Sequence, residues 1–189
     1  MDQGISVKAL NFITPFCGYY KKGREEEVHE HARRTYGIHL EVIDVGREYT
    51  EVVAHPRHGY GKHLNPCVDC KIFFISKARE RMEAEGASFL ITGEVIGQRP
   101  MSQRRDTLYI IQRESGTEGI LLRPLCSQHL PPTIPEKEGW VDRARLLDFA
   151  GRGRKSQIAL AATYGIKDYP PPAGGCLLAD PNISARLQW

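Results

Sequence analysis

The chain has 189 residues, of which 41% are hydrophobic and 26% charged. This is the composition of a globular protein and excludes intrinsic disorder, and the length suits one α/β domain or one domain with a small appendage. The net charge of +3 and the pI near 8.6 allow nucleic-acid binding without arguing for it. No apolar run approaches the roughly 20 residues that span a bilayer, and residues 1–8 lack signal-peptide features. We therefore expect a cytoplasmic protein without a membrane partner, whose cysteines serve metal or redox chemistry rather than disulfides.

Strands and helices are predicted to alternate along the first part of the chain. Apolar alternation, helical four-residue spacing and glycine stops define them. The predicted strands cover 5–13, 38–45, 88–92 and 120–123, and the predicted helices cover 24–36, 48–54, 68–85 and 107–112. Such alternation indicates an α/β fold with a parallel sheet and right-handed crossovers.

The character of the sequence changes after Pro124. Helices are predicted over 142–149 and 155–164, and the proline-rich segment 169–176 is incompatible with regular structure. We therefore expect an α/β core at residues 1–125 and a helical C-terminal extension at residues 126–189, which carries a Pro-Ala-Gly-Gly-Cys turn.

The strongest local signal for chemistry is the pair Cys67 and Cys70, spaced as CxxC at the start of a predicted helix. A helix N-terminus favours thiolates, and two thiols at this spacing can hold one metal ion or one cluster. The pair is therefore interpreted as a redox pair, half of a zinc site, or part of an iron–sulfur site. Zinc needs four ligands, which would have to include distant Cys126, Cys176 or a histidine such as His129.

Cys176 follows two glycines that let the backbone pass close to a bulky group. Either it is a buried thiol in a turn, or it joins Cys67 and Cys70 on a four-iron cluster with one iron left open for a sulfide. Cys126 is interpreted either as a packing residue or as a fourth ligand.

Residues 92–103 follow a predicted parallel strand, at the edge where α/β sheets bind ligands. The segment is either an ordinary polar loop or a ligand-binding loop. Its candidate binding residues are Thr92, Gly93, Glu94, Gln98, Ser102 and Gln103.

Basic residues gather near these motifs, either as solvated surface or as contacts to a phosphate backbone. The candidate RNA-binding residues are Lys62, Arg99, Arg104, Arg105, Arg152, Arg154 and Lys155.

Five separated strings together resemble one family. Residues 92–103 (TGEVIGQRPMSQ) match the TGE-x-x-GQ-x-x-SQ signature of ThiI, the tRNA 4-thiouridine synthase. Residues 65–70 (NPCVDC), 123–125 (RPL), 131–140 (PPTIPEKEGW) and 172–178 (PAGGCLL) fit ThiI-like, PP-loop ATP-utilising proteins. The resemblance covers nearly the whole chain.

The resemblance implies an adenine-nucleotide α-hydrolase fold, a Rossmann-like parallel sheet with flanking helices. ATP would adenylate the uracil oxygen, and sulfur would then displace AMP. In cluster-bearing relatives three cysteines hold a 4Fe-4S cluster, which implies Cys67, Cys70 and Cys176 as ligands and catalytic residues. Gly93, Glu94 and Gln98 would lie near the adenylate or the base. The implied partners are tRNA and a sulfur donor, either sulfide or a carrier protein. A homodimer is one oligomeric state considered for this chain.

The family opens with a strand and an SGG-x-DS phosphate loop, which this sequence does not contain. We therefore expect an N-terminally incomplete fold, a fragment or a degenerate relative, in which ATP and Mg²⁺ bind if the loop is supplied. The leading interpretation is a tRNA uridine sulfurtransferase core. The alternatives are a non-catalytic module that binds RNA and a cluster or zinc, and a PP-loop enzyme acting on another substrate.

Overall fold

The computed structural model describes residues 2–16, 23, 25–167, 169 and 176–187, which form two compact units. One unit comprises Met1–Cys67 and Ile166–Trp189, and the other is the continuous segment Val68–Gly165. Residues 125 and 126, where the sequence predicts a boundary, both lie in this continuous unit.

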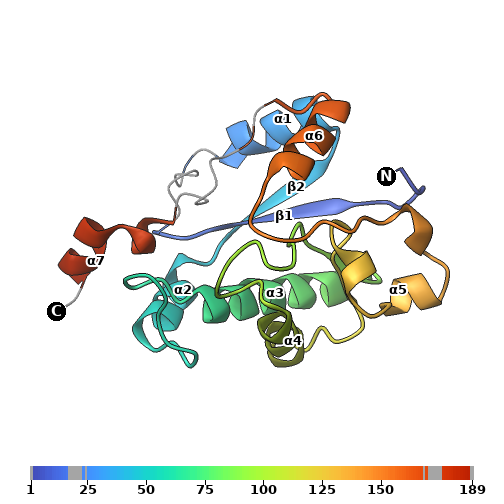
Figure 1. The fold of residues 1–189 in the computed structure, drawn as a ribbon. Helices are drawn as coiled ribbons and strands as arrows, with labels where there is room; N and C mark the ends of the chain where they lie inside the picture. The colour runs from blue at the N-terminus through green and yellow to red at the C-terminus, as the bar shows by residue number, and fades with distance from the viewer. Residues whose placement is uncertain (1, 17–22, 24, 168, 170–175, 188–189) are drawn as a thin grey trace. The chain divides into compact units, whose positions relative to one another are not determined.

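The first unit is built on a parallel pair of strands (Figure 1). Strand β1 (Lys8–Ile13) pairs with β2 (His39–Asp44), in a register that places Lys8 opposite His39. Parallel strands need a crossover connection, and helix α1 (Glu25–Tyr36) supplies it. These three elements confirm the predicted strand–helix–strand order to within three residues at each boundary.

The rest of the first unit comes from both ends of the chain. Helix α2 (Gly46–Ala54) follows β2, while the 3₁₀ turn η3 (Leu177–Ala179) and helix α7 (Pro181–Leu187) come from the C-terminal part. Two hydrogen bonds join these distant segments: Leu177 N donates to Phe16 O at 3.0 Å, and Leu64 N donates to Ser184 Oγ at 3.5 Å.

The second unit begins in helix α3 (Cys67–Ala84) and contains a second parallel pair, β3 (Leu90–Ile91) and β4 (Leu121–Leu122). Helix α4 (Arg105–Glu114) connects the two strands. Both strands are shorter than predicted, because only two residue pairs are in register. Gly93 and Pro124, each two residues beyond a strand end, disfavour extension on that side. The described residues thus form a mixed α/β structure with small parallel sheets and flanking helices.

Short helices fill the remainder of the second unit: η1 (Ser127–His129), α5 (Ile134–Lys137), η2 (Arg143–Arg145) and α6 (Lys155–Thr163). The prediction of a helix over 142–149 was wrong beyond this single turn. Leu146 is extended, after which Leu147 N donates to Pro124 O and Phe149 N donates to Leu125 O. Pairing with the backbone after β4 therefore replaces helical hydrogen bonds.

The hydrophobic core of the second unit joins its helices to its sheet. Val68 and Ile75 of α3 pack with Ile111 of α4 and Leu121 of β4, and Leu90 of β3 lies against them. Ile111 and Leu121 are at most 1% exposed. The core therefore fixes the ends of β3 and β4, from which the polar segments of the candidate site continue.

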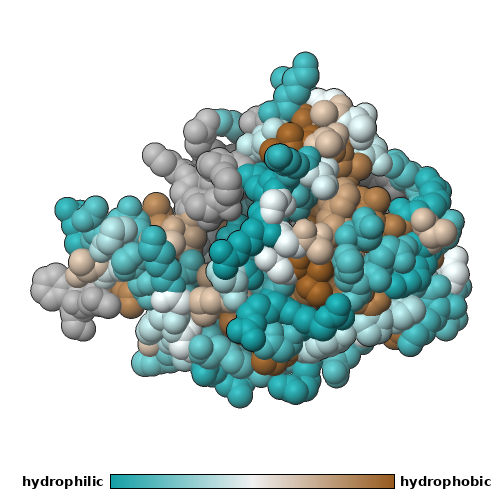
Figure 2. All heavy atoms as spheres, in the orientation of Figure 1, coloured by the Kyte–Doolittle hydropathy of each residue, from teal (hydrophilic) through white to brown (hydrophobic). Residues whose placement is uncertain are grey.

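Hydrophilic residues cover most of the face seen in Figure 2, with hydrophobic residues in separate patches. Within the described residues, no helix combines the length and apolar character that crossing a membrane requires.

Replacing Ile111 with alanine should test this core. Ile111 is fully buried, so Ile111→Ala is expected to lower the free energy of unfolding by about 2–5 kcal/mol. Ile158→Ala is the matched control, because Ile158 is 42% exposed and its loss should change stability by less than about 0.5 kcal/mol. Urea denaturation measures both, and equal effects would contradict the assigned core.

Candidate functional site

The CxxC pair occupies the first turn of α3, as predicted. Cys67 is the first helical residue and Cys70 follows one turn later; both are partly exposed. Buried Pro66 precedes the helix, and Cys67 Sγ donates a hydrogen bond to Asn65 Oδ1 at 3.0 Å. Asn65 is itself fixed, because its carbonyl accepts from Gly61 N at 2.9 Å. The NPCVDC string therefore presents two accessible thiols on a held helix start, where the helix dipole favours negative charge.

The third predicted ligand, Cys176, is partly buried and directly precedes η3. Residues 170–175 of the predicted Pro-Ala-Gly-Gly-Cys turn lie outside the described residues. Among the residues that the structure describes, no group of three or more His, Cys, Asp or Glu side chains is arranged to hold a metal ion. The structure thus presents Cys67 and Cys70 in one turn and leaves the role of Cys176 as a prediction.

Cys126 is completely buried, and its Sγ donates to the carbonyl of Glu94 at 3.3 Å. Burial raises the pKa of its thiol above the ordinary value of 9.0, against an opposing backbone hydrogen bond from Ile96. A metal ligand must be a thiolate. The protonated, internally bonded thiol of Cys126 therefore favours the packing interpretation of this residue.

A network of polar side chains in the second unit is centred on Glu94, which is only 2% exposed. Its Oε2 accepts from Arg123 Nε at 2.8 Å and from Thr92 Oγ1 at 3.3 Å. Lys71 Nζ, one residue after the CxxC pair in α3, lies 3.7 Å from Oε1. A buried carboxylate needs such charge compensation, so Glu94 ties the loop after β3 to both β4 and α3.

Backbone hydrogen bonds fold residues 93–103 into a compact loop. Gly97 N donates to Gln103 O at 2.7 Å, and Gln98 N donates to Val95 O at 3.1 Å. Ser102 and Gln103 are buried, whereas Gly93 is exposed and Gln98 is partly buried. Five of the six predicted binding residues therefore lie in this loop and Thr92 directly precedes it, while Glu94, Ser102 and Gln103 are the buried ones.

Three buried polar atoms of this loop and its neighbour have no hydrogen-bond partner within the described residues: Glu94 Oε1, Gln103 Oε1 and Arg123 Nη2. Glu94 Oε1 still has the ammonium of Lys71 nearby. Buried polar groups are normally paired. The network therefore retains hydrogen-bonding capacity beyond its internal contacts.

A backbone bridge joins the chain before one predicted basic cluster of the second unit to the chain before the other. Ile96 forms a parallel bridge with Ala150, and Gly151 N donates to Ile96 O at 2.9 Å. The loop leading to Arg104 and Arg105 is thereby joined to the segment that continues into Arg152. Lys62, also predicted, is exposed in the loop before α3.

The list of candidate residues from the sequence omitted Arg123 and Lys71, the cationic partners of Glu94. A signal for Arg123 existed, because a charged residue directly after two strand leucines is expected to be buried with a counterion. No comparable signal marked Lys71, one of several charged residues on α3.

Breaking the buried ion pair should be costly. Arg123→Met leaves the Glu94 carboxylate buried without its main partner, and we expect a loss of about 3–5 kcal/mol of unfolding free energy. The control Arg113→Met removes a side chain that is 66% exposed and should cost less than about 1 kcal/mol. In the double variant Glu94→Gln/Arg123→Met the loss should be smaller than the sum of the single losses; strict additivity in urea denaturation would refute the coupling.

The buried thiol of Cys126 should make stability fall at alkaline pH. A folded-state pKa raised above the unfolded value contributes stability that is complete below the unfolded pKa and is lost as pH rises toward the folded pKa. The difference in unfolding free energy between wild type and Cys126→Ser should be constant below about pH 8 and decrease above about pH 9. Denaturation curves measured across this pH range provide the test. If the thiol were exposed, the difference in unfolding free energy between wild type and Cys126→Ser would not change with pH.

Comparison with known proteins supports the resemblance carried by these motifs. The family model described as Thiamine biosynthesis protein (ThiI) matches residues 1–131, which is 131 of the 189 residues. Neither a search of the curated proteins nor a search of the solved structures found a match. The matched region contains the CxxC helix start, the loop around Glu94 and the Arg123 partner. The chain therefore belongs to the ThiI family, whose role is in tRNA thiolation and thiamine biosynthesis.

Proposed function

We propose that this protein is the core of a tRNA uridine sulfurtransferase that uses ATP to adenylate the base. Membership of the ThiI family carries the proposal. The partly exposed thiols of Cys67 and Cys70 at a helix start support it, because sulfur transfer needs accessible soft ligands or nucleophiles. The strand–helix–strand units support the further proposal of an adenine-nucleotide α-hydrolase fold.

The chemistry follows from the poor leaving ability of a uracil oxygen. In the proposed first step that oxygen attacks the α-phosphorus of ATP, pyrophosphate leaves, and a proton is lost from the base. In the second step hydrosulfide, supplied as sulfide or through a carrier protein, attacks the activated ring carbon and AMP leaves with the oxygen. Thiouridine, AMP and pyrophosphate are the products.

Glu94 is proposed to act by position. Its carboxylate is buried against Arg123 and Thr92, so it holds the loop that contains Gly93 and Gln98. Gly93 is exposed, which allows a ligand to approach the backbone there. We propose that Gly93 and Gln98 lie near the adenylate or the base and that Glu94 keeps them there.

We also propose that Cys67 and Cys70, with Cys176, bind a 4Fe-4S cluster that carries the sulfur. The donor chemistry of the CxxC pair fits two cluster ligands. Since the described residues gather no third ligand at this pair, the assignment of Cys176 depends on the spacing of the family motif, and no reaction step is derived through the cluster.

The function is tested by thiouridine in tRNA. The gene is deleted, and its complete coding region is returned to the strain on a plasmid. The wild-type plasmid should restore thiouridine, and plasmids with Cys67→Ala or Cys70→Ala should give at least about tenfold less thiouridine than wild type. Cys126→Ser is the control and should retain wild-type levels, because Cys126 is completely buried. Thiouridine that is unaffected by gene deletion would overturn the proposal.

The cluster is tested separately by iron and inorganic sulfide analysis of protein purified without oxygen. Wild type should contain both, with a visible absorption band that Cys67→Ala and Cys176→Ala lose and Cys126→Ser keeps. Stoichiometric zinc without sulfide would replace the cluster with a structural metal site. Full cluster content in Cys176→Ala would remove that residue from the ligand set.

A further inference from the structure

A wide, open hollow with a volume of about 550 Å³, called the cavity below, lies on the surface of the second unit beside the first turns of α4. Ligand sites commonly measure roughly 300–1,000 Å³, and the volume of this hollow lies within that range. Its lining residues come from the loop after β3 and from the start of α4: Ile96, Gly97, Arg104, Arg105, Asp106 and Tyr109.

An aromatic ring forms part of this cavity. Tyr109 is 43% exposed and makes no hydrogen bond in the described part of the chain. It lies four residues after Arg105 in α4, so the two side chains share one face of the helix. Ile96 adds apolar surface from the loop. The cavity therefore combines an accessible ring with a neighbouring guanidinium.

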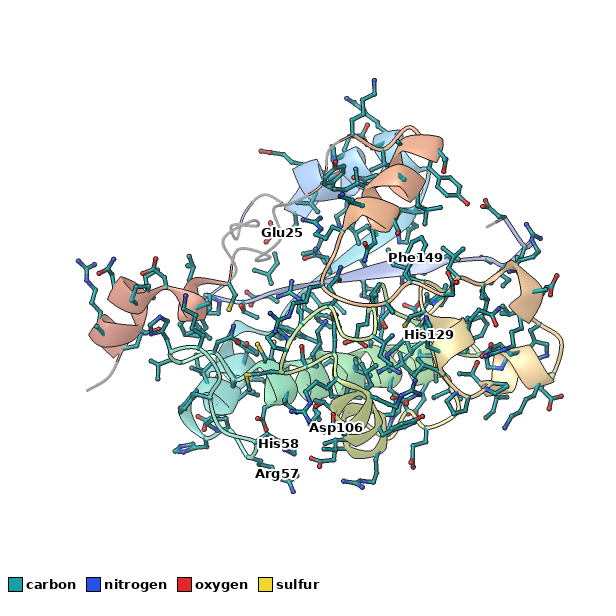
Figure 3. The ribbon with its side chains drawn as sticks, in the orientation of Figure 1. Glu25, Arg57, His58, Asp106, His129 and Phe149 are labelled. Carbon is teal, nitrogen blue, oxygen red and sulfur yellow. The ribbon has the colours of Figure 1, made fainter. Side chains whose placement is uncertain are left out.

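Each charged residue of the cavity has a partner within the protein. Arg105 Nη1 donates to His129 O at 2.8 Å, which leaves its other N–H groups available. Arg104 Nη2 lies 3.0 Å from Asp106 Oδ2, and Figure 3 shows Asp106 on α4. The backbone N–H of Thr107, followed by the charge of Arg104, lowers the pKa of Asp106, which is therefore ionised at neutral pH. Two guanidinium groups and one carboxylate leave a net positive charge.

Two residues that line the cavity, Ile96 and Gly97, contact the backbone just before the second basic cluster. The bridge between Ile96 and Ala150 places the backbone of Gly151 against Gly97, where an added Cβ would lie 3.4 Å from Gly151 N. Arg152 and Lys155, both exposed, follow within five residues of this contact. Basic side chains thus continue from the cavity along the chain, as a phosphate backbone would require.

We infer that this cavity binds one unstacked nucleotide of single-stranded RNA, with its base on the Tyr109 ring and its phosphates near Arg105 and Arg152. The inference rests on the proposed function, in which RNA is the substrate. Single-stranded bases stack on aromatic side chains and beside arginines, whereas bases within an RNA duplex remain inaccessible to such a ring. Tyr109 would thus be a binding residue of the substrate.

The test is fluorescence anisotropy with a fluorescein-labelled oligouridylate and purified full chain. Tyr109→Ala should weaken binding about tenfold, whereas Tyr109→Phe keeps the ring and should stay within about twofold. Tyr164→Ala is the control, because Tyr164 is 59% exposed in the same unit and does not line the cavity. Thermal unfolding verifies that the variants are folded.

Further measurements test the phosphate contact and distinguish single-stranded RNA from duplex RNA and from free ATP as the ligand. Arg105→Gln should reduce the slope of log affinity against log salt by about 0.7, as expected for one lost single-strand phosphate contact. Duplex RNA should bind wild type and Tyr109→Ala equally, and ATP at millimolar concentration should not displace the oligouridylate.

The binding results distinguish failure of the inference from failure of the proposed function. If wild type binds the oligouridylate and Tyr109→Ala binds it equally well, the inference fails and the proposed function stands. Displacement by ATP that depends on Tyr109 would assign the cavity to a free nucleotide and also overturn the inference. If wild type binds neither the oligouridylate nor tRNA, the proposed function fails together with the inference.

Discussion

The ion pair between Glu94 and Arg123 determines the arrangement of the candidate site in the second unit. Both residues are 2% exposed, and the two side chains are joined at 2.8 Å. A charge removed from water is stable only with a partner in good geometry. The pair therefore restricts where the loop after β3 can lie relative to the end of β4, and Cys126 adds a hydrogen bond to the Glu94 carbonyl. Ile96 and Gly97, which line the cavity, follow within three residues.

A second charged contact organises the chain between β4 and the basic residues that begin at Arg152. Arg143 pairs with Glu136 and also donates to the carbonyls of Ser127 and Leu130, each at 2.9 Å. Glu136 completes a capping box with Thr133 at the start of α5. Arg143 thus joins η1 and the residue after it to α5. Thr133 and Glu136 of these contacts belong to the PPTIPEKEGW string. The chain continues from Arg143 to Ala150, which bridges to Ile96.

Local patterns in the sequence were sufficient to predict most helices and strands. The four-residue spacing of α1, the apolar run of β3 and the CxxC helix start all corresponded to observed elements. Residues 142–149 were misassigned because their apolar spacing suits a helix, while the hydrogen bond from Phe149 N to Leu125 O depends on a segment over 20 residues away. Local periodicity contains no information about such pairing.

The candidate site shows the same limit. The cysteine pair and the glycine-rich loop have local signatures, so both were predicted. Lys71 had no local signature, and the local signal for Arg123 did not identify its partner, because both residues meet Glu94 only after α3 and β4 pack together. Tyr109 had no signature either, since an aromatic residue on a helix usually belongs to the core. Its exposure and its place in a cavity are properties of the folded chain.

The division of the chain into a continuous unit and one made of two distant segments has a consequence for protein synthesis. Ribosomes release a chain from its N-terminus onward, and domains generally fold as units during this process. All residues of Val68–Gly165 are therefore available to pack together as soon as this segment has emerged. The other unit must wait for Leu177 and Ser184, whose hydrogen bonds reach Phe16 and Leu64. During that interval Phe16 and Leu64 lack these C-terminal partners, so the first unit is completed later than the second.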